Sequence, residues 1–242
     1  MRSRPFRVSR IFARVAACIG LAALGACTSP PTRFYTLAVD DGAGNASGAS
    51  NVTLLIDMLA VHVPTPAAGT RLVVQTSATQ VDILEDDRWA SPVGDEIRGA
   101  LSTLVTRQLN AVDVHGVPHD DSLLVYRVAV DVQRFESWPG SHVLIDVVWS
   151  MRPTRGQQTL TCRSMVRENV TEGNDALVDG HRRALEEIAS EIVGCIRAVG
   201  AKPALRATSA RAVSDTMPAS TVHCPASAVA GCTTHAGLDA RG

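Results

Sequence analysis

The sequence predicts a single α+β domain in which a mainly antiparallel or mixed β-sheet is covered on one face by two α-helices. Three observations support this prediction. Residues 51–200 hold nearly all of the periodic apolar sequence, and the predicted elements within them follow the order strands, helix, strands, helix. The aromatic content is only 4%, with 18 Gly and 12 Pro, which favours one modest hydrophobic core.

The first predicted helix begins at Pro92. Ser91 is a suitable N-cap residue, and Pro92 suits the first helical position. Asp95 and Glu96 then lie where the helix dipole favours negative charge. The apolar residues that follow recur at helical spacing and form one face: Ile97, Leu101, Leu104, Val105 and Leu109.

The second predicted helix begins after Asn174 and extends to about Val199. Gly200 provides a C-terminal stop, and Pro203 follows shortly after it. The helix is amphipathic, and its apolar face consists of Leu177, Leu185, Ile188, Ile192, Cys195, Ile196 and Val199.

Three strand-like runs separate the helices: SLLVYRVAVDVQRF, HVLIDVVWSM and QTLTCRSMVREN. Apolar and polar residues alternate in them, which is typical of antiparallel strands that are buried on one side. The apolar sets of the first two runs are Leu124, Tyr126, Val128, Val130 and Val132, and Val143, Ile145, Val147, Trp149 and Met151. Pro139-Gly140 between these runs suits the centre of a type II turn. Upstream, VTLLIDMLAVHV, RLVVQTS and QVDILED are interpreted as further strands.

Residues 1–26 contain the parts of a secretory signal peptide. Five arginines precede the short apolar segment Val15–Leu24, and small residues follow it. The sequence Leu-Gly-Ala-Cys that ends at Cys27 resembles the lipobox of bacterial lipoproteins. That resemblance implies that the signal is cut before Cys27, which then carries S-diacylglycerol and N-palmitoyl groups. The alternative is an ordinary signal peptide with an incidental Cys27, but Leu24, three residues before the cysteine, favours lipidation.

Composition divides the rest of the chain into three parts. Residues 27–50 form a small-residue tether with a short predicted strand at 34–37, and residues 51–200 form the folded domain. Residues 201–242 contain no aromatic side chain and no regular apolar period. Because such a segment cannot bury enough surface to offset its ordering entropy, we expect a disordered C-terminal tail.

The charge of the chain argues against nucleic acid as a partner. Five of the 23 Lys and Arg residues lie in residues 1–26, which leaves 18 basic and 24 acidic residues, a formal charge of −6. Binding to phosphates needs a basic surface, and anionic lipid headgroups need a polybasic patch; the sequence offers neither.

No sequence motif indicates catalysis, a metal site or a cofactor. The chain contains no CxxC, HExxH or GxSxG motif and no phosphate-binding glycine loop. His115, His119 and Asp120 are close in sequence, but Gly116 and Pro118 keep the two histidines off one helical face, which favours a solvated loop. The acidic segment LEDDRW, residues 84–89, does not by itself define a catalytic pair. We therefore predict a protein that is not an enzyme, with no catalytic residues, no metal and no cofactor.

Four cysteines, an even number, remain after the signal and Cys27 are set aside. Cys162 alternates with Leu160 on the core side of its predicted strand, and Cys195 lies on the apolar face of the second helix. A disulfide between these two and a pair of buried thiols are both consistent with the pattern. Cys224 and Cys232 lie in the predicted tail, where a small-loop disulfide and free thiols are equally open.

Several segments together resemble the PqiC-type (YmbA-like) ABC-type transport auxiliary lipoproteins. These are the lipobox, RFYTL soon after it, RLVVQTSATQVDILEDDRWASPVGDEIRGAL, and YRVAVDVQRFESWPGSHVLIDVVWSM. The resemblance runs from about Cys27 to Ala198. Its most specific parts are Arg88-Trp89-Ala90 with Pro92, and the segment Asp131–Phe135. In structural terms we expect Trp89 to pack under the first helix, and Asp131 and Arg134 to lie on the polar sheet face.

The resemblance implies an accessory subunit of an MCE-type (mammalian-cell-entry) lipid transport and membrane-integrity system. The implied partners are a periplasmic MCE-domain protein, its inner-membrane partner and, through the lipid anchor, the membrane; a homo-oligomer is also open. Thr28 after the acylated cysteine favours the periplasmic face of the outer membrane, because lipoproteins kept at the inner membrane usually carry Asp there. The alternative function is a scaffold for outer-membrane barrel or lipopolysaccharide assembly, and an envelope hydrolase ranks third. For partner contact we expect the polar strand faces and an exposed loop at Asp82–Trp89.

Overall fold

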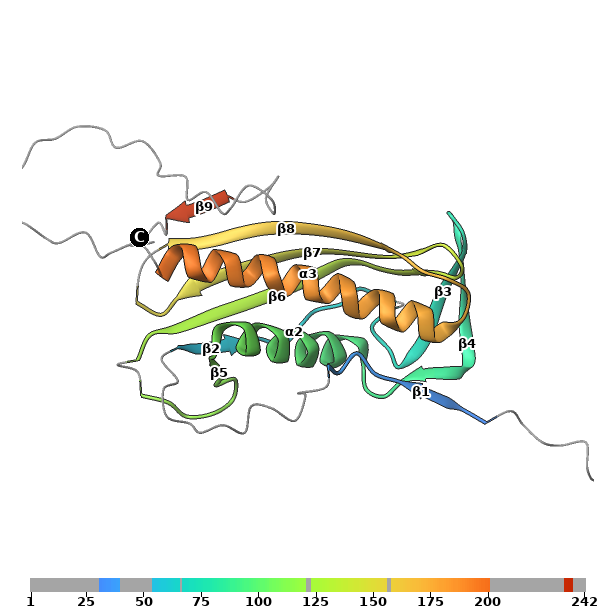
Figure 1. Cartoon of the computed structure of the whole chain (residues 1–242), viewed down its shortest axis with the longest axis horizontal. Helices are drawn as coiled ribbons and strands as arrows, with labels where there is room; N and C mark the ends of the chain where they lie inside the picture. The colour runs from blue at the N-terminus through green and yellow to red at the C-terminus, as the bar shows by residue number, and fades with distance from the viewer. Residues whose placement is uncertain are drawn as a thin grey trace, which may run out of the picture. The chain divides into compact units, whose positions relative to one another are not determined.

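The computed structural model describes residues 31–39, 54–65, 67–120, 123–155, 158–200 and 233–236. The described residues from Phe34 onward belong to one compact unit. Its described residues contain two helices and two mixed or antiparallel sheets (Figure 1). The predicted fold class, a single α+β domain, is confirmed.

The larger sheet has the strand order β5-β2-β6-β7-β8-β9. Its strands are β2 (Leu55–Met58), β5 (Val112–Asp113), β6 (Val125–Trp138), β7 (His142–Pro153), β8 (Gln158–Asn169) and β9 (Thr233–Ala236). β6 to β9 are antiparallel neighbours, whereas β2 pairs in parallel with both β5 and β6. The three runs predicted between the helices are therefore confirmed as β6, β7 and β8. The sequence did not predict β5 or β9.

The turn between β6 and β7 has the predicted type II features. Gly140 has φ of +65°, the left-handed value that this turn requires at its third position, and Pro139 precedes it. The backbone N–H of Ser141 donates to the carbonyl of Trp138 at 3.1 Å, which closes the turn.

A β-bulge in β6 changes which side chains face the helices. The register with β7 shifts between Val132 and Arg134, so that Val132 pairs with Val147 and Phe135 pairs with Ile145. Before the bulge the even-numbered residues of β6 face inward; after it the odd-numbered residues do. The segment Asp131–Phe135 therefore places Arg134 on the outer face of the sheet, and the exposed positions of Asp131 and Arg134 agree with the prediction.

The smaller sheet consists of β1 (Arg33–Tyr35), β4 (Gln80–Trp89) and β3 (Arg71–Ser77), in the order β1-β4-β3. β3 and β4 form an antiparallel hairpin. Val74 of this hairpin packs against Val143 of β7 and Leu177, so the small sheet contacts the same face of the large sheet as the helices do. The segment Asp82–Trp89 is part of β4, and the prediction of an exposed loop there was wrong.

The first helix, α2 (Val93–Leu109), begins one residue later than predicted. Pro92 is its N-cap residue, and no side chain caps the helix. The prediction of Ser91 as the N-cap was wrong, because the hydroxyl of Ser91 donates instead to the carboxylate of Glu96 at 2.8 Å. Most of the predicted apolar face is buried, and Asn110 ends the helix in the left-handed conformation.

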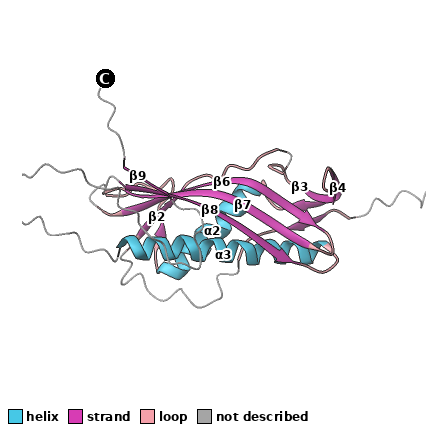
Figure 2. Cartoon of the chain, turned by 90° about the horizontal axis from the view of Figure 1, so that it is seen from above, coloured by secondary structure: helices cyan, strands magenta, loops and turns pink. Residues whose placement is uncertain are grey.

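The second helix, α3 (Asn174–Gly200), matches its prediction in both extent and face. It lies with α2 on one side of the large sheet (Figure 2). Buried residues from both helices and from β6, β7 and β8 form one hydrophobic core. Trp89 belongs to this core, with its ring packed edge-on against Phe135 of β6 at 6.0 Å and His181 of α3 at 6.2 Å.

The two ends of the chain are only partly described. The signal segment with Cys27 lies outside the described residues, as do residues 201–232 and 237–242. The strand predicted at 34–37 is observed as β1 at Arg33–Tyr35, and within the predicted tail Thr233–Ala236 forms β9 along the first residues of β8.

Candidate functional site

The segment after β1 is fastened to α2 through one carboxylate. Glu96 Oε2 accepts from the hydroxyl of Thr36 at 2.7 Å and from the backbone N–H of Leu37 at 2.8 Å. Its other oxygen accepts from the backbone N–H and the hydroxyl of Ser91. Because four donors satisfy the buried carboxylate and Leu37 is buried beside it, the RFYTL segment has a fixed place on the domain.

The acidic segment of residues 84–89 is a strand whose side chains are divided between core and surface. Asp87 is buried and accepts a hydrogen bond from the hydroxyl of Tyr35 at 3.1 Å. Trp89 is buried as well, whereas Glu85 is exposed. The segment holds β1 in place, and Asp87 is therefore unsuitable as an exposed partner contact.

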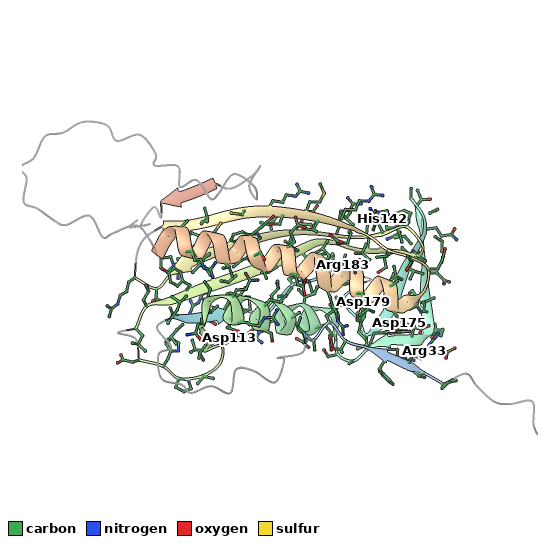
Figure 3. The ribbon with its side chains drawn as sticks, viewed as in Figure 1. Arg33, Asp113, His142, Asp175, Asp179 and Arg183 are labelled. Carbon is green, nitrogen blue, oxygen red and sulfur yellow. The ribbon has the colours of Figure 1, made fainter. Side chains whose placement is uncertain are left out.

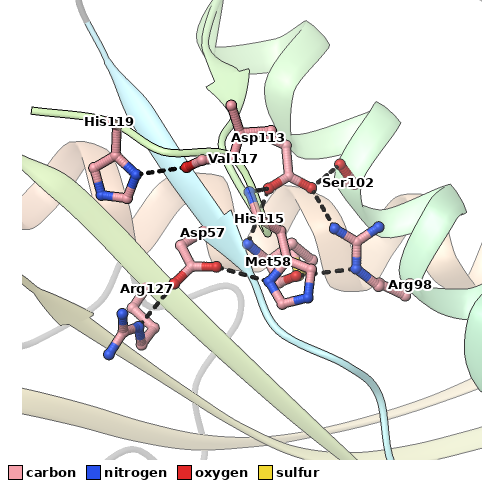
Figure 4. Close-up of polar contacts among 9 residues, drawn as sticks. All are labelled: Asp57, Met58, Arg98, Ser102, Asp113, His115, Val117, His119 and Arg127. Atoms are coloured by element: carbon pink, nitrogen blue, oxygen red, sulfur yellow. Dashed lines mark hydrogen bonds and ion pairs between the residues drawn. The ribbon is translucent and has the colours of Figure 1, made fainter.

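The neighbourhood of His115 and His119 consists of two carboxylate-centred contacts (Figure 4). Asp57 of β2 accepts from Arg127 Nε at 2.8 Å and bonds to His115 Nδ1 at 2.9 Å. Burial opposes the ionisation of Asp57, but the hydrogen bonds with His115 and Arg127 outweigh it and lower the pKa of the carboxyl. His119 bonds through Nδ1 to the carbonyl of Val117 at 3.0 Å, apart from this cluster.

The second contact centres on Asp113 of β5. Its carboxylate accepts from Arg98 Nη2 at 2.9 Å and from the hydroxyl of Ser102 at 2.6 Å, both on α2. It also accepts from the backbone N–H of Met58 at 3.2 Å, so it fastens the edge strand to β2 and to the helix. The described residues contain no group of three or more His, Cys, Asp or Glu placed to hold a metal ion.

Ser137 and His181 form a pair that resembles a nucleophile with its base. Ser137 Oγ and His181 Nε2 are 2.8 Å apart, and the imidazole stacks on Phe135 with ring centroids 4.0 Å apart. His181 is fully buried, and burial lowers its pKa to about 3. Its Nδ1 has no hydrogen-bond partner within the part of the chain that the structure describes. A substrate has no access to this pair, so we interpret it as a contact between α3 and β6 in the core.

Cys162 and Cys195 are both buried in the core and both disulfide-bonded. The pairing of these two cysteines with each other stays a prediction. Cys224 and Cys232 lie outside the described residues.

The face of the large sheet opposite the helices carries a band of polar and aromatic side chains across β6, β7 and β8. The strand registers place these residues on one face, since Arg134 pairs with Asp146, and Asp146 pairs with Met165. His142, labelled in Figure 3, is the first residue of β7. We call the whole set the outer strip: Arg134, Glu136, Trp138, His142, Asp146, Arg163, Met165 and Arg167.

One end of the outer strip is a chain of direct contacts. Arg134 donates through Nε and Nη2 to the two oxygens of Glu136, at 2.8 and 3.1 Å. Trp138 Nε1 donates to the same carboxylate at 3.1 Å, and the indole stacks on His142 at 5.5 Å. The imidazole Nδ1 of His142 contacts Arg167 Nη2 at 3.1 Å. The contacts therefore run continuously from β6 to β8.

Asp146 is the buried member of the outer strip. Its side chain is 1% exposed and accepts two hydrogen bonds from Arg163, at 2.9 and 2.6 Å. The guanidinium of Arg163 is itself open to solvent, with 61% of the side chain exposed. A buried carboxylate thus holds a cation at the surface in a fixed orientation.

The protonation states in the outer strip follow from these contacts. Burial raises the pKa of Glu136, but hydrogen bonds from Arg134 and Trp138 outweigh it, so the net shift is downward. The hydrogen bonds to Asp146 raise the pKa of Arg163. Burial, together with the nearby charge of Arg167, lowers the pKa of His142. Near neutral pH the strip therefore presents the cations of Arg134 and Arg163 and the ionised carboxylate of Glu136 beside the neutral imidazole of His142.

The outer strip has the composition of a protein contact surface. Arg, Trp and Met are enriched in protein interfaces and Arg and Trp at their hot spots. Met165 is 63% exposed in the middle of the strip and adds an apolar side chain to its charged neighbours. The sequence analysis predicted that the polar strand faces make contacts, but it did not predict Trp138 and Met165. The alternation of QTLTCRSMVREN already places Met165 opposite the core.

The comparison with known protein families gives a match over most of the domain. The model of the ABC-type transport auxiliary lipoprotein component family matches residues 35–193, which is more than half of the chain. No curated protein matches the chain. None of the described helices is both long and apolar enough to cross a membrane.

The solved structures that resemble the chain include two crystal structures. A crystal structure of an uncharacterized protein has 22% identity and a TM-score of 0.56, and the match covers 69% of this chain and 99% of that chain. The crystal structure of protein XCC0632 from Xanthomonas campestris has 18% identity and a TM-score of 0.49, over 62% of this chain and 85% of that one. The first of these supports the fold alone.

The family match agrees with the lipobox, with the fold and with the segments RFYTL and DVQRF, which the structure shows to be a docked strand and a bulge. Members of this family are cell-envelope lipoproteins that assist a transport system, and the family is not a known enzyme family. The chain belongs to the ABC-type transport auxiliary lipoprotein component family.

Proposed function

We propose that this lipoprotein is a non-enzymatic docking subunit of an MCE-type lipid transport system at the periplasmic face of the outer membrane. Cys27 carries its lipid anchor, and the outer strip receives the periplasmic MCE-domain protein, which connects it to the inner-membrane partner. The single observation that supports this function most strongly is the family match over residues 35–193, because it ties the chain to a transport system.

The polar groups of the described residues agree with a protein that acts by binding a partner rather than by catalysis. The Ser137–His181 pair is buried, and the two carboxylates near His115 are occupied by Arg127 and Arg98. These groups support the fold. The outer strip, in contrast, combines exposed cations with an exposed methionine, and such a surface suits the binding of a protein partner.

The membrane assignment rests on the sequence around Cys27. The lipobox supports acylation, and Thr28 after the cysteine supports the outer membrane. Each acyl methylene contributes about 0.8 kcal/mol of membrane binding, so the three chains that the lipobox implies would hold the protein permanently.

Two measurements on intact cells test this function. Cys27→Ser should leave an uncleaved precursor without acyl chains, whereas a variant that still matures and stays in outer-membrane fractions would refute the anchor. Crosslinking of the acylated protein in the envelope, followed by mass spectrometry, should recover an MCE-domain protein. Recovery of a barrel-assembly or lipopolysaccharide-assembly protein in its place would overturn the transport function and favour the scaffold function.

Loss of the protein should also resemble loss of the transporter. We expect a deletion strain to have a leakier outer membrane, with greater sensitivity to detergents and lipophilic toxins. The deletion should add nothing in a strain that already lacks the MCE-domain protein, because both act in one system. An additive defect would show that the two proteins act separately.

A further inference from the structure

Phe34 of β1 is the most exposed large apolar side chain of the described residues. Its side chain is 67% exposed, although the residues that follow it are docked on the domain. Removal of apolar surface from water is favourable, so a ring that is exposed on a well-held strand is available for an apolar contact outside the domain.

The docking of β1 does not use Phe34. Tyr35 donates through its hydroxyl to Asp87, and the backbone N–H of Ala90 donates to the carbonyl of Tyr35 at 2.7 Å. Arg182 of α3 donates to the carbonyl of Thr36 at 2.8 Å. Together with the contacts of Glu96, these bonds hold the strand without any contribution from the ring of Phe34.

Chain length places Phe34 close to the anchor. Phe34 is the seventh residue after Cys27, and a fully extended chain spans at most about 3.6 Å per residue, so the two Cα atoms are at most about 25 Å apart. The polar interfacial region of a bilayer adds several ångströms outside the hydrocarbon core. If Cys27 is acylated, the first strand of the domain is therefore held within reach of the membrane surface at all times.

We propose that Phe34 inserts into the headgroup region of the membrane that holds the Cys27 lipids, and that this second contact orients the domain. The inference rests on the lipidation in the proposed function. A membrane is favoured over a protein partner because the tether keeps the lipid surface at high effective concentration. The formal charge of −6 leaves apolar insertion, rather than attraction to anionic lipids, as the available contact.

The docking of β1 on the domain explains how insertion of Phe34 would affect the orientation of the domain. Because Tyr35, Thr36 and Leu37 are bonded to β4, α2 and α3, a ring held in the membrane restricts the orientation of the whole domain. A tether alone would leave the domain free to turn.

Fluorescence on vesicles tests the insertion. The full acylated protein is purified with Phe34→Trp or with one of two controls, Met165→Trp on β8 and Val117→Trp after β5, which replace other exposed apolar side chains. Each is bound to phosphatidylethanolamine–phosphatidylcholine vesicles with or without lipids brominated near the headgroup. The emission of the wild type, from Trp89, Trp138 and Trp149, is subtracted.

We expect the emission of Phe34→Trp to shift to the blue on vesicles and to be quenched by brominated lipid, while both controls keep their emission. Three results would overturn the proposal: no quenching of Phe34→Trp on bound protein, stronger quenching of a control, or a shift that depends on protein density rather than on lipid, which indicates a second copy. Mass measurement of the acyl chains and vesicle flotation separate the two hypotheses. Acylated protein that floats without quenching refutes only the insertion, and protein without acyl chains refutes the anchor and the insertion together.

Discussion

The two faces of the β6–β8 part of the large sheet are built from alternate residues of the same strands, yet they differ in almost every property. The inner face carries apolar side chains such as Val128 and Ile145, and α2, α3 and the small sheet cover it. The outer face carries Arg134, Arg163 and Met165, and no described helix lies on it (Figure 2). The inner face is thus the core of the domain, and the outer face presents fixed charges to solvent.

The comparison teaches that the exposed side chains of the outer strip contribute less to the stability of the fold than the inner face does. Burial of apolar surface supplies most of the folding free energy, and solvent-exposed ion pairs contribute little. The contacts Arg134–Glu136 and Arg163–Asp146 hold their side chains in place, and we attribute that arrangement to recognition. We therefore expect changes on the inner face to act mainly on the stability of the domain. Changes at exposed positions of the outer face should act mainly on the binding of a partner.

The largest difference in stability should separate two tryptophans. Trp149 is buried on the inner face, where Trp149→Ala should lower the free energy of unfolding by about 3–5 kcal/mol through lost burial and a new cavity. Trp138→Ala on the outer face should cost clearly less, because that side chain is only half-buried. Denaturant unfolding of both variants measures the difference, and equal costs would show that the two faces are not as distinct as the structure indicates.

A disulfide between Cys162 and Cys195 would fasten α3 to the inner face of β8. If the two cysteines are paired, the double variant with Ala at both positions should lose about 2–4 kcal/mol of stability. Peptide mapping under non-reducing conditions should recover one peptide pair that contains both residues. Recovery of either cysteine joined to Cys224 or Cys232 would refute this pairing.

Acid should lower the free energy of unfolding of the domain through His181, which is buried against the inner face. The folded protein holds its pKa at about 3, against an ordinary value of 6.5. Between these values the unfolded chain binds a proton that the folded protein excludes, so this contribution to stability is complete above pH 6.5 and falls as the pH is lowered toward 3. The slope reaches about 1.4 kcal/mol per pH unit. Urea unfolding from pH 7 to 4 should show a steeper loss in the wild type than in His181→Gln, and identical slopes would contradict the buried neutral imidazole.

Removing Arg163 should have a smaller effect. Arg163→Met leaves the buried carboxylate of Asp146 without its two hydrogen bonds, which should cost about 1–3 kcal/mol. The control Arg107→Met, at an exposed position of α2, should change stability by less than about 0.5 kcal/mol. Thermal unfolding of the two variants tests whether Asp146 depends on Arg163, and equal melting temperatures would contradict that dependence.

The smallest change in stability should accompany the largest change in binding. The double substitution Met165→Asp with Arg167→Glu alters two exposed residues and should cost less than about 1 kcal/mol in total. It should nevertheless abolish capture of the transporter partner, whereas Arg107→Glu should not. Capture that survives in the double variant would place the contact elsewhere on the domain.

Much of the fold could be predicted from local pattern, because period-two alternation in β7 and helical spacing in α3 are direct consequences of one-sided burial. The features that were missed depend on contacts distant in sequence. β5 is two residues long and exists through Asp113, which bonds to β2 and α2. Ser91 has the chemistry of an N-cap, but Glu96 uses its hydroxyl.

Contacts distant in sequence also explain why parts of the candidate site could not be predicted. The acidic run of β4 has the composition of a surface loop, and only the docking of Tyr35 shows that Asp87 is buried. The outer strip depends on the bulge between Val132 and Arg134, which alternation alone does not reveal. Met165 on β8, however, could be placed on the outer face from the sequence, because the alternation of QTLTCRSMVREN sets it opposite the core.

The central claim is that the outer strip contacts the transporter, and site-specific photo-crosslinking in living cells tests it most directly. A photoreactive amino acid is placed at Met165 on the outer face or at Arg107 on α2, in the otherwise unchanged, acylated protein. The account predicts an ultraviolet-dependent adduct with an MCE-domain protein from position 165 and none from position 107. An adduct with that protein from position 107 alone, or no such adduct from either position, would contradict it.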